Sequence, residues 1–319
     1  MFHEFPNSEP AIANSGTGVT KKEHHRPPSE KLDAQPRITI FAIPKAFEGA
    51  VGLIQRNAIR SWARLQPRVD VLLIGQEAGI AEVAAELGVR HCPHLKCNSQ
   101  GTPLVSDAFE TVQRNSSSPI LVYCNCDVIL LKSFVKAIER ICDEQLNSFV
   151  AFGRRTDLHV DQEIHFDNRL ELESLLTHCH EQGQPSSVVC KEYFAFTRGV
   201  YDEVPPFAVG RGNWDNWMIH AAKVRHVPVI DISQVAIAIH QSHDYGHLGG
   251  SRWRCYVDGS EALENQRLGG GRHLISGSTP THVLNDRGIR KLWFSRWNLA
   301  FWADFPRFVG LLNRLLRSR

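Results

Sequence analysis

Hydrophobic residues along the chain recur with two different spacings, which alternate between residues 38 and 125. Strand-like apolar runs occupy residues 38–43, 69–75, 89–91 and 119–125. Apolar residues at helical spacing predict helices over residues 49–65, 80–87 and 104–114. Because parallel strands need crossover connections and helices supply them, the alternation predicts an α/β fold with a mainly parallel sheet flanked by helices.

The second half of the chain has a looser pattern. It predicts helices over residues 132–141, 170–180 and 216–224, and strands over residues 148–153, 188–197, 227–231 and 235–240. Turn-rich segments such as EVPPFAVGRGN separate these elements. We expect this irregular half to be built onto the sheet as the floor of a cleft.

Composition narrows the class of protein. With 42% hydrophobic and 22% charged residues, the chain resembles an average globular protein rather than a fibrous or disordered one. Its 36 Lys and Arg residues nearly balance 34 Asp and Glu residues, so we expect no nucleic-acid partner. The first strand is followed by AIPKAF instead of Gly-x-Gly-x-x-Gly, which argues against a dinucleotide site.

The two ends of the chain differ from its centre, and three parts are expected: a flexible leader (1–35), a catalytic domain (36–285) and a basic, aromatic helical tail (286–319). The leader lacks the apolar run of a secretion signal, and no stretch approaches the roughly 18 apolar residues of a membrane span. We therefore expect a cytoplasmic protein. The apolar stripe of the tail would either pack on the domain or lie against a membrane surface, as in a peripheral membrane protein.

Asp127 follows the apolar run that ends in Asn125 and Cys126. In open parallel sheets the ligand crevice lies at the carboxyl ends of the strands, so Asp127 is placed to face a substrate. Its carboxylate suits Mg²⁺ or Mn²⁺, which take few protein carboxylates together with phosphate oxygens. The alternative is a turn or helix-capping role for Asp127.

Asp215 lies in the segment GRGNWDNW. Trp214 and Trp217 offer flat apolar faces that stack on sugar rings, and a carboxylate beside them would act as a general base toward a sugar hydroxyl. The alternative is that Asp215 caps the next helix while the two tryptophans belong to the core.

Further polar residues suggest metal or phosphate binding. His240, at the end of a buried strand, and His243 are candidate metal ligands, with structural histidines as the alternative. Thr102 opens a helix whose amides and hydroxyl would meet a nucleotide, or it belongs to an ordinary loop and helix start. Arg154 or Arg155 would pair with a diphosphate, or with Asp157 in a surface ion pair. The cysteines lack the spacing of a zinc site.

In this order, the segments LVYCNCDVIL, FVAFGRR, GRGNWDNWMIHAA and AIHQSHDYGH resemble the GT-A type glycosyltransferases, nucleotide-sugar-dependent transferases allied to family 2. The resemblance covers about residues 38–247. It places Asn125, Cys126 and Asp127 at the Asp-x-Asp motif, with Asn125 replacing the first Asp. It implies that Asp127 and His240 hold the metal, that Asn125 lies at the donor ribose, and that Asp215 acts as base in an acceptor-side second half.

The sequence therefore predicts a Mn²⁺- or Mg²⁺-dependent glycosyltransferase. Its partners would be a nucleotide-sugar donor, bound with the help of Thr102, Asn125 and Arg154, and a carbohydrate or other hydroxyl acceptor. One alternative is nucleotidyl transfer onto a sugar phosphate, for which the loop after the first strand offers only Lys45. The other is a non-catalytic protein that binds nucleotide sugars.

Overall fold

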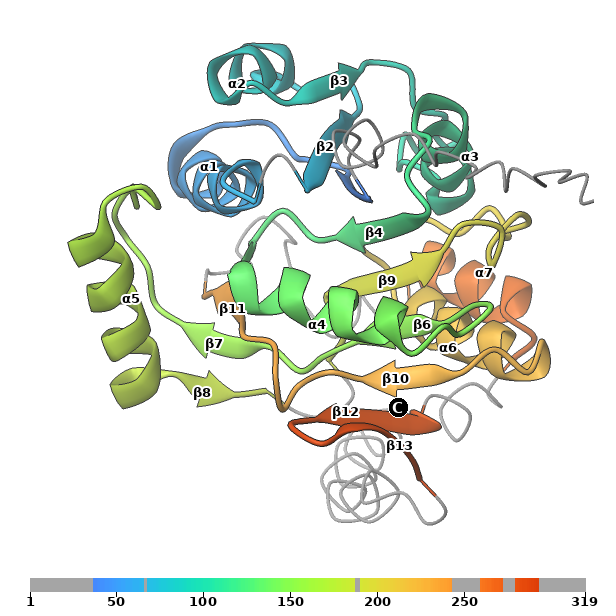
Figure 1. Cartoon of the computed structure of the whole chain (residues 1–319). Helices are drawn as coiled ribbons and strands as arrows, with labels where there is room; N and C mark the ends of the chain where they lie inside the picture. Colours follow the sequence, from blue (N-terminus) through green and yellow to red (C-terminus); the bar gives the residue numbers. More distant parts are fainter. Residues whose placement is uncertain (1–36, 66–67, 187–189, 243–258, 272–278, 293–319) are drawn as a thin grey trace, which may run out of the picture. The chain divides into compact units, whose positions relative to one another are not determined.

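The computed structural model describes residues 37–65, 68–186, 190–242, 259–271 and 279–292, and it contains two β-sheets flanked by helices (Figure 1). In the first half, strands and helices alternate as predicted. These elements are β1 (Ile38–Ala42), α1 (Gly49–Ala63), β2 (Val69–Ile74), α2 (Ile80–Leu87), β3 (Arg90–Cys92), α3 (Val105–Asn115) and β4 (Ile120–Cys124). Their bounds agree with the predicted ones to within two residues.

The second half holds more elements than its sequence pattern predicts. They are β5 (Val128–Leu130), α4 (Lys132–Asp143), β6 (Val150–Phe152), β7 (Thr156–Leu158), α5 (Arg169–Gln182), β8 (Gln184–Pro185), β9 (Tyr193–Thr197), α6 (Trp214–Val224), β10 (Val229–Asp231), β11 (Ala238–Gln241), α7 (Ser260–Leu268), β12 (His282–Asn285) and β13 (Gly288–Lys291). The unpredicted strands β5, β7, β8, β12 and β13 have four residues or fewer, too few for a periodic pattern to emerge. The predicted strand over 188–197 is confirmed only for β9.

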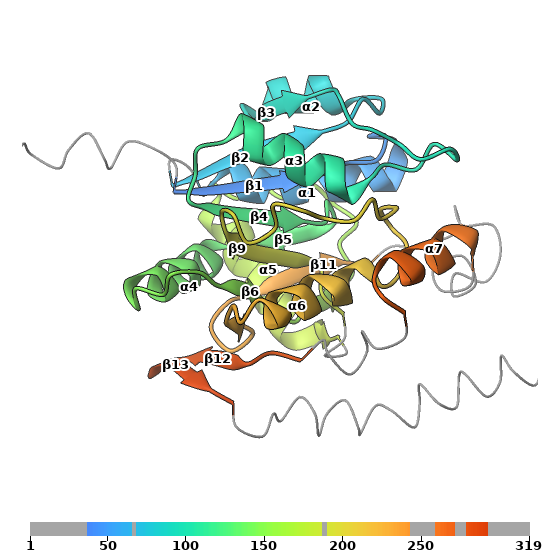
Figure 2. The same cartoon turned by 90° about the vertical axis from the view of Figure 1, so that its right-hand side faces the viewer.

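The larger sheet has nine strands in the order β13-β12-β10-β6-β9-β4-β1-β2-β3 (Figure 2). Most neighbours are parallel, whereas β9 runs antiparallel to both β4 and β6, and β13 runs antiparallel to β12. This sheet confirms the predicted fold class, a mixed but mainly parallel sheet flanked by helices. The second half is built onto this sheet, as expected, because β6, β9, β10, β12 and β13 continue it.

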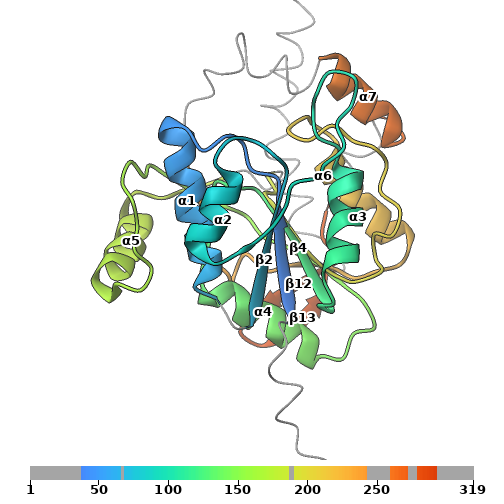
Figure 3. The ribbon, with the colours of Figure 1, turned by 90° about the horizontal axis from the view of Figure 1, so that it is seen from above.

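Two apolar cores lie on opposite faces of the larger sheet. Ile38, Ile40 and Ala42 of β1 belong to the core shared with α1, α2 and α4. Phe41 points to the other face, into the core that contains apolar residues of α3 and α6. Side chains along a strand alternate between faces, so an almost continuously apolar strand fills both cores. Figure 3 shows α1 and α2 on one side of β2 and β4, and α3 on the other.

The smaller sheet has four short strands in the order β5-β11-β7-β8. β11 pairs antiparallel with β5 and parallel with β7, while β7 pairs antiparallel with β8. Ile129 of β5, Leu158 of β7 and Ile239 of β11 form a third apolar cluster with Leu175 of α5. The strand predicted over 235–240 is therefore found as β11, in a sheet that the sequence pattern did not reveal.

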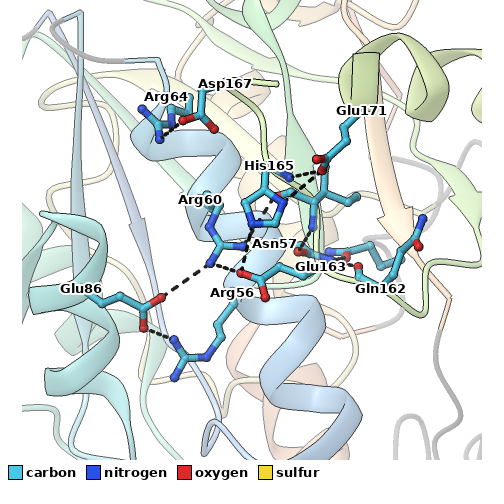
Figure 4. Close-up of polar contacts among 12 residues, drawn as sticks. Arg56, Asn57, Arg60, Arg64, Glu86, Gln162, Glu163, His165, Asp167 and Glu171 are labelled. Carbon is cyan, nitrogen blue, oxygen red and sulfur yellow. Dashed lines mark hydrogen bonds and ion pairs between the residues drawn. The ribbon is translucent and has the colours of Figure 1, made fainter. Parts of the chain in front are cut away.

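Polar side chains of helix α1 contact the segment that follows β7 (Figure 4), and Asn57 also contacts β11. Asn57 is fully buried, and its amide donates to the Gln162 carbonyl oxygen at 2.9 Å and to Gln241 Oε1 at 3.1 Å. Gln241 in turn donates from Nε2 to the Ile54 carbonyl oxygen at 2.7 Å. Since buried polar groups need partners, these contacts fix the position of β11 against α1.

Several expectations concern residues near the chain ends. The predicted leader and the apolar stripe of the tail, with its membrane contact, fall on residues 1–36 and 293–319 and lie outside the described residues. The hairpin of β12 and β13 continues across residue 285, where we expected the domain to end. Among the described helices, none has the length and apolar character required to span a bilayer.

Candidate active site

The chain turns sharply at the carboxyl end of β4, where Asn125, Cys126 and Asp127 lie. The Asn125 N–H donates to the Glu192 carbonyl oxygen at 2.9 Å, and the Val128 N–H returns to the Asn125 carbonyl oxygen at 3.2 Å. Asp127 leads directly into β5, and α4 begins only at Lys132 with Leu131 as its N-cap residue. Asp127 is therefore not a helix cap, but it lies in the turn between β4 and β5, which is the other part of that alternative.

His240 of β11 lies beside Asp127. His240 Nε2 is 3.4 Å from Asp127 Oδ2, and the His240 side chain is 4% exposed against 22% for Asp127. The strand register explains this approach, because His240 pairs with Val128 across β11 and β5. The structure thus brings together two residues that the sequence names as metal ligands although 113 positions separate them. The third, His243, lies outside the described residues.

Asp157 reaches the same histidine from β7. Its Oδ1 lies 2.8 Å from His240 Nδ1, opposite the side that faces Asp127. Sequence reasoning considered Asp157 only as a surface partner of Arg154 or Arg155. The sequence around Asp157 is Thr-Asp-Leu, a strand of mixed polarity that is too short to be distinguished from a loop by its pattern.

Arg155 and Glu192 complete the polar surroundings. Arg155 Nε lies 2.9 Å from Asp157 Oδ1, and its Nη1 forms an ion pair with Glu192 Oε1. Glu192 also accepts a hydrogen bond from the Asn125 side-chain amide. Burial raises the pKa of Glu192 and the Asp127 charge raises it further, whereas the Arg155 charge lowers it. The contacts form a ring from Asn125 through Glu192, Arg155, Asp157 and His240 to Asp127.

Lys45 lies in the loop that follows β1, the strand parallel to β4. The buried Gln55 of α1 shapes this loop by accepting from the Lys45 backbone N–H at 2.7 Å and donating to its carbonyl oxygen at 3.0 Å. Desolvation lowers the pKa of Lys45, and the negative charge of Asp127 opposes that change. A cation therefore accompanies Asp127 at the carboxyl edge of the sheet.

Asp215 lies in the first turn of α6, two residues beyond the N-cap residue Asn213. It is thus not the helix cap that we weighed as its alternative. Its Oδ1 is buried without a hydrogen-bond partner among the described residues. Burial raises the pKa of Asp215 while the charge of the buried Lys191 lowers it. A carboxylate with a raised pKa is suited to accept a proton.

Trp214 and Trp217 pack against other aromatic rings. The Trp214 ring meets Tyr123 edge to face at a centroid distance of 5.0 Å, and its side chain is buried. Trp217 packs against Phe207 at 5.4 Å and against Tyr201 at 6.2 Å. Both indoles thus have the core-packing role that we weighed against sugar stacking, and Trp217 alone is partly exposed.

Thr102 lies in the loop that precedes α3. Helix α7 contacts this loop through polar side chains. The Thr102 N–H donates to Asn98 Oδ1 at 3.0 Å, and Asn98 donates to Glu261 of α7 at 2.6 Å. The same Glu261 accepts from Arg211 Nε at 2.8 Å in the segment leading to α6. One helix therefore holds two loops, and sequence reasoning missed it because Ser260–Leu268 carries no marked apolar stripe.

Arg154 differs from its neighbour Arg155. Its Nε donates to the Ser186 carbonyl oxygen at 3.1 Å, and its backbone N–H donates to Ser233 Oγ at 2.7 Å. The ion pair with Asp157 that we weighed for either arginine is made by Arg155. Within the described ranges, no hydrogen bond or ion pair joins Thr102, Arg154 or Asp215 to Asp127.

The pair of Asp127 and His240 fits a small divalent cation. Two ligands bound at about 2.1 Å at right angles lie about 3 Å apart, close to the observed 3.4 Å. Across the part of the chain that the structure describes, no group of three His, Cys, Asp or Glu side chains forms a metal site. Two protein ligands suffice for Mg²⁺ or Mn²⁺ when phosphate oxygens supply others.

Solved structures that match the chain include glycosyltransferases of the GT-A type, the class that its sequence segments resemble. A mannosyltransferase from Pyrobaculum calidifontis, in complex with GDP-Man and Mn²⁺, matches at 14% identity and a TM-score of 0.43, over 70% of this chain and 62% of that one. Glucosyl-3-phosphoglycerate synthase from Mycobacterium tuberculosis, in complex with Mg²⁺ and uridine-diphosphate, matches with the same identity and TM-score over 78% of this chain and 86% of its own. No protein-family model and no curated protein sequence matches.

Proposed function

We propose that this chain is a divalent-metal-dependent glycosyltransferase that moves a sugar from a nucleoside-diphosphate sugar to an acceptor hydroxyl. The observation that carries the proposal is the pair of Asp127 and His240, 3.4 Å apart at the carboxyl edge of the sheet. Ligands bind at this edge in open α/β sheets. The sequence resemblance to GT-A transferases gives the same two residues the same role.

Asp127 and His240 would hold Mn²⁺ or Mg²⁺, which supplies positive charge to the departing diphosphate. Lys45 adds a cation on the same side. Asn125 and Thr102 would contact the donor nucleotide, and Arg154 retains a guanidinium nitrogen for a phosphate oxygen beyond those that bind Ser186. The donor site would thus join the loops after β1 and β4 and the loop before α3.

Asp215 would act as the general base. The acceptor oxygen forms a bond to the anomeric carbon, the bond from that carbon to the diphosphate oxygen breaks, and its electron pair leaves with the diphosphate. The acceptor proton passes to Asp215, whose raised pKa suits this role. Direct attack of this kind inverts the anomeric configuration. Trp217, the partly exposed indole, would border the acceptor, with Trp214 behind it.

Calorimetric titration tests the proposal. UDP, GDP and ADP, and the corresponding nucleotide sugars, are titrated into the wild-type chain with and without Mn²⁺, and into the variant Asp127→Asn. We expect nucleotide binding that requires Mn²⁺ and that weakens by more than about a hundredfold in Asp127→Asn. Loss of a residue that only orients a metal ligand costs about 10- to 100-fold in metal affinity, and loss of the metal ligand itself should cost more. The exposed Asp161, varied to Asn, is the matched control and should bind normally.

Two other results would replace the proposal. Metal-dependent donor binding without sugar transfer to any of a panel of hydroxyl acceptors would favour a non-catalytic nucleotide-sugar-binding protein. Release of pyrophosphate from a nucleoside triphosphate and a sugar phosphate would favour a nucleotidyltransferase. An Asp127→Asn variant with full transfer activity would remove the metal site from the mechanism.

A further inference from the structure

Helix α7 carries two buried polar side chains that reach the segment leading into α6. Glu261 and Asn265 lie four positions apart and therefore on one face of the helix. Their exposed fractions are 7% and 1%. Buried polar groups need hydrogen-bond partners, and both side chains have partners outside α7. This helix therefore holds its neighbours by directed polar contacts.

Asn265 brackets residues 208–212. Its Oδ1 accepts from the Ala208 N–H at 2.8 Å, and its Nδ2 donates to the Ala208 carbonyl oxygen at 3.0 Å and to the Gly212 carbonyl oxygen at 3.3 Å. One side-chain amide thus joins both ends of the segment. All three contacts are with the stretch of backbone that leads to Asp215.

Glu261 joins the same segment to the loop of Thr102. Its Oε2 accepts from Arg211 Nε at 2.8 Å and lies 2.6 Å from Arg211 Nη2, while its Oε1 accepts from Asn98 Nδ2 at 2.6 Å. Asn98 Oδ1 in turn accepts from the Thr102 N–H at 3.0 Å. Loss of the carboxylate would leave the partly buried Arg211 charge without this partner.

The segment that these contacts hold has an unusual backbone. The φ angle is 69° at Gly210 and 81° at Asn213, the residue that directly precedes α6. Glycine adopts such angles freely, whereas a residue with a side chain does so at a cost and persists there only when its surroundings hold it. The Asn213 side chain makes no capping hydrogen bond of its own. The contacts of Glu261 and Asn265 are therefore suited to hold this turn.

We propose that α7 positions the general base: Glu261 and Asn265 hold the turn at residues 210–213 in the conformation that begins α6, and thereby set the place of Asp215 relative to the loop of Thr102. The inference rests on the proposed function, in which Asp215 takes the acceptor proton and Thr102 contacts the donor. Glu261 and Asn265 touch neither substrate and are positioning residues. Their loss should reduce turnover because the base moves away from the reacting oxygen.

Hydrogen exchange followed by mass spectrometry is the first measurement, made on the full-length chain without metal or nucleotide. We expect amides of residues 213–219 to exchange about 10- to 100-fold faster in Asn265→Ala and in Glu261→Gln than in the wild type. Amides of α4 should be unchanged. Glu264, on the exposed face of the same helix, is the matched control, and Glu264→Gln should exchange as the wild type does. If Asn265→Ala does not fold, Glu261→Gln carries the comparison with Glu264→Gln.

A rescue variant tests whether the strained turn is the cause. Glycine at position 213 accepts the positive φ angle without the steric cost, so adding Asn213→Gly to Asn265→Ala or to Glu261→Gln should slow the exchange of α6 by about fivefold. A void in α7 would not be filled by removing a side chain at position 213. Absence of any rescue in both pairs would show that the turn is not what these residues hold.

Turnover is the second measurement. The probe is the nucleotide sugar that binds with Mn²⁺ in the calorimetric series, with the panel of hydroxyl acceptors. Asn265→Ala should lower kcat by about 10- to 100-fold and leave the KM for the nucleotide sugar within about twofold, since Asn265 contacts only the segment that carries the base. Glu261→Gln should lower kcat and also raise that KM, because Glu261 contacts the loop of Thr102 as well. Glu264→Gln should change neither.

The results separate the inference from the proposed function. Wild-type exchange in both Asn265→Ala and Glu261→Gln would overturn the role of α7 and leave the glycosyltransferase proposal standing. Faster exchange with an unchanged kcat would show that α7 holds the turn but does not position the base, which also overturns the inference. A wild type that binds no nucleotide and transfers no sugar would overturn the function and, with it, the role of Asp215 as the base that α7 positions.

Discussion

The two sheets of this molecule are built on different physical principles. In the nine-stranded sheet, every residue of β1 and β4 is buried, and the side chains alternate between two apolar cores. In the four-stranded sheet, the strands have two to four residues and carry Asp157, His240 and Gln241. Apolar burial thus forms the scaffold, whereas matched polar contacts position the candidate chemistry.

This difference implies that stability and ligand binding can be separated by mutation. Apolar burial is non-directional, so damage to the large sheet lowers the free energy of unfolding without changing the geometry at its edge. The polar contacts of the small sheet are directional, so a changed partner there alters the site. The following variants test that separation, beginning with the largest expected effect.

The largest change in stability is expected from Phe41→Ala in β1. Phe41 is fully buried, and its ring meets Phe109 and Tyr123 edge to face at 5.0 and 5.7 Å. Truncation should lower the free energy of unfolding by about 3 to 5 kcal/mol, measured by urea denaturation, because the lost contacts leave a cavity. The Mn²⁺ affinity of the remaining folded protein should be unchanged.

Phe41→Leu is the matched control, and it should cost less than about 1.5 kcal/mol because most of the volume is retained. A Phe41→Ala variant with full stability but weakened Mn²⁺ binding would reverse the assignment of roles to the two sheets.

The large sheet could be predicted because its strands are long apolar runs with turn residues between them. Strand-like and helix-like apolar patterns alternate over residues 38–125 and predicted each strand and helix there. The parallel arrangement followed from the connecting helices. The reversal of β9 could not be predicted, since a strand reads the same in either direction. The hairpin of β12 and β13 was not predicted, because polar residues such as His282 and Lys291 interrupt its short strands.

The site could be predicted only where residues follow long strands or belong to the motif segments. Asp127 was found in this way, as was His240, and the fold brought the two together. Asp157 and Glu192 were missed because they depend on pairing between strands distant in sequence. Glu192, with Lys191, interrupts the apolar run predicted over residues 188–197, and that charged pair was the available signal.

An intermediate effect is expected from Asn125→Asp, which restores the acidic residue that the resembled motif carries. In this chain the Asn125 amide donates to Glu192, whose side chain is 14% exposed. A carboxylate at position 125 loses the donor and faces a like charge. We expect a loss of about 1 to 3 kcal/mol in the free energy of unfolding, with weaker rather than stronger Mn²⁺ binding.

The double variant Asn125→Asp with Glu192→Gln tests the cause. The glutamine amide restores a donor across the same contact, so the double variant should recover most of the stability lost in Asn125→Asp, measured by the same urea titrations in a double-mutant cycle. If the two changes are merely additive, the pair is not coupled, and Asn125 has been retained for another reason.

The smallest effect concerns His282 of β12, the strand next to the edge strand β13 of the large sheet. Burial lowers the pKa of His282, and the charge of Lys291 on the paired strand β13 lowers it further. The unfolded chain therefore binds the proton more readily than the folded one, so stability decreases as the pH falls through the ordinary histidine range. Between about pH 7.5 and pH 5.5, the free energy of unfolding should decrease less steeply for His282→Asn than for the wild type, measured by urea denaturation.

The exposed His178 of α5 is the control, and its replacement by Asn should leave the slope of unfolding free energy against pH unchanged. Equal slopes for His282→Asn and the wild type would show that His282 stays hydrated in the hairpin of β12 and β13 and has the same pKa in the folded and unfolded chain.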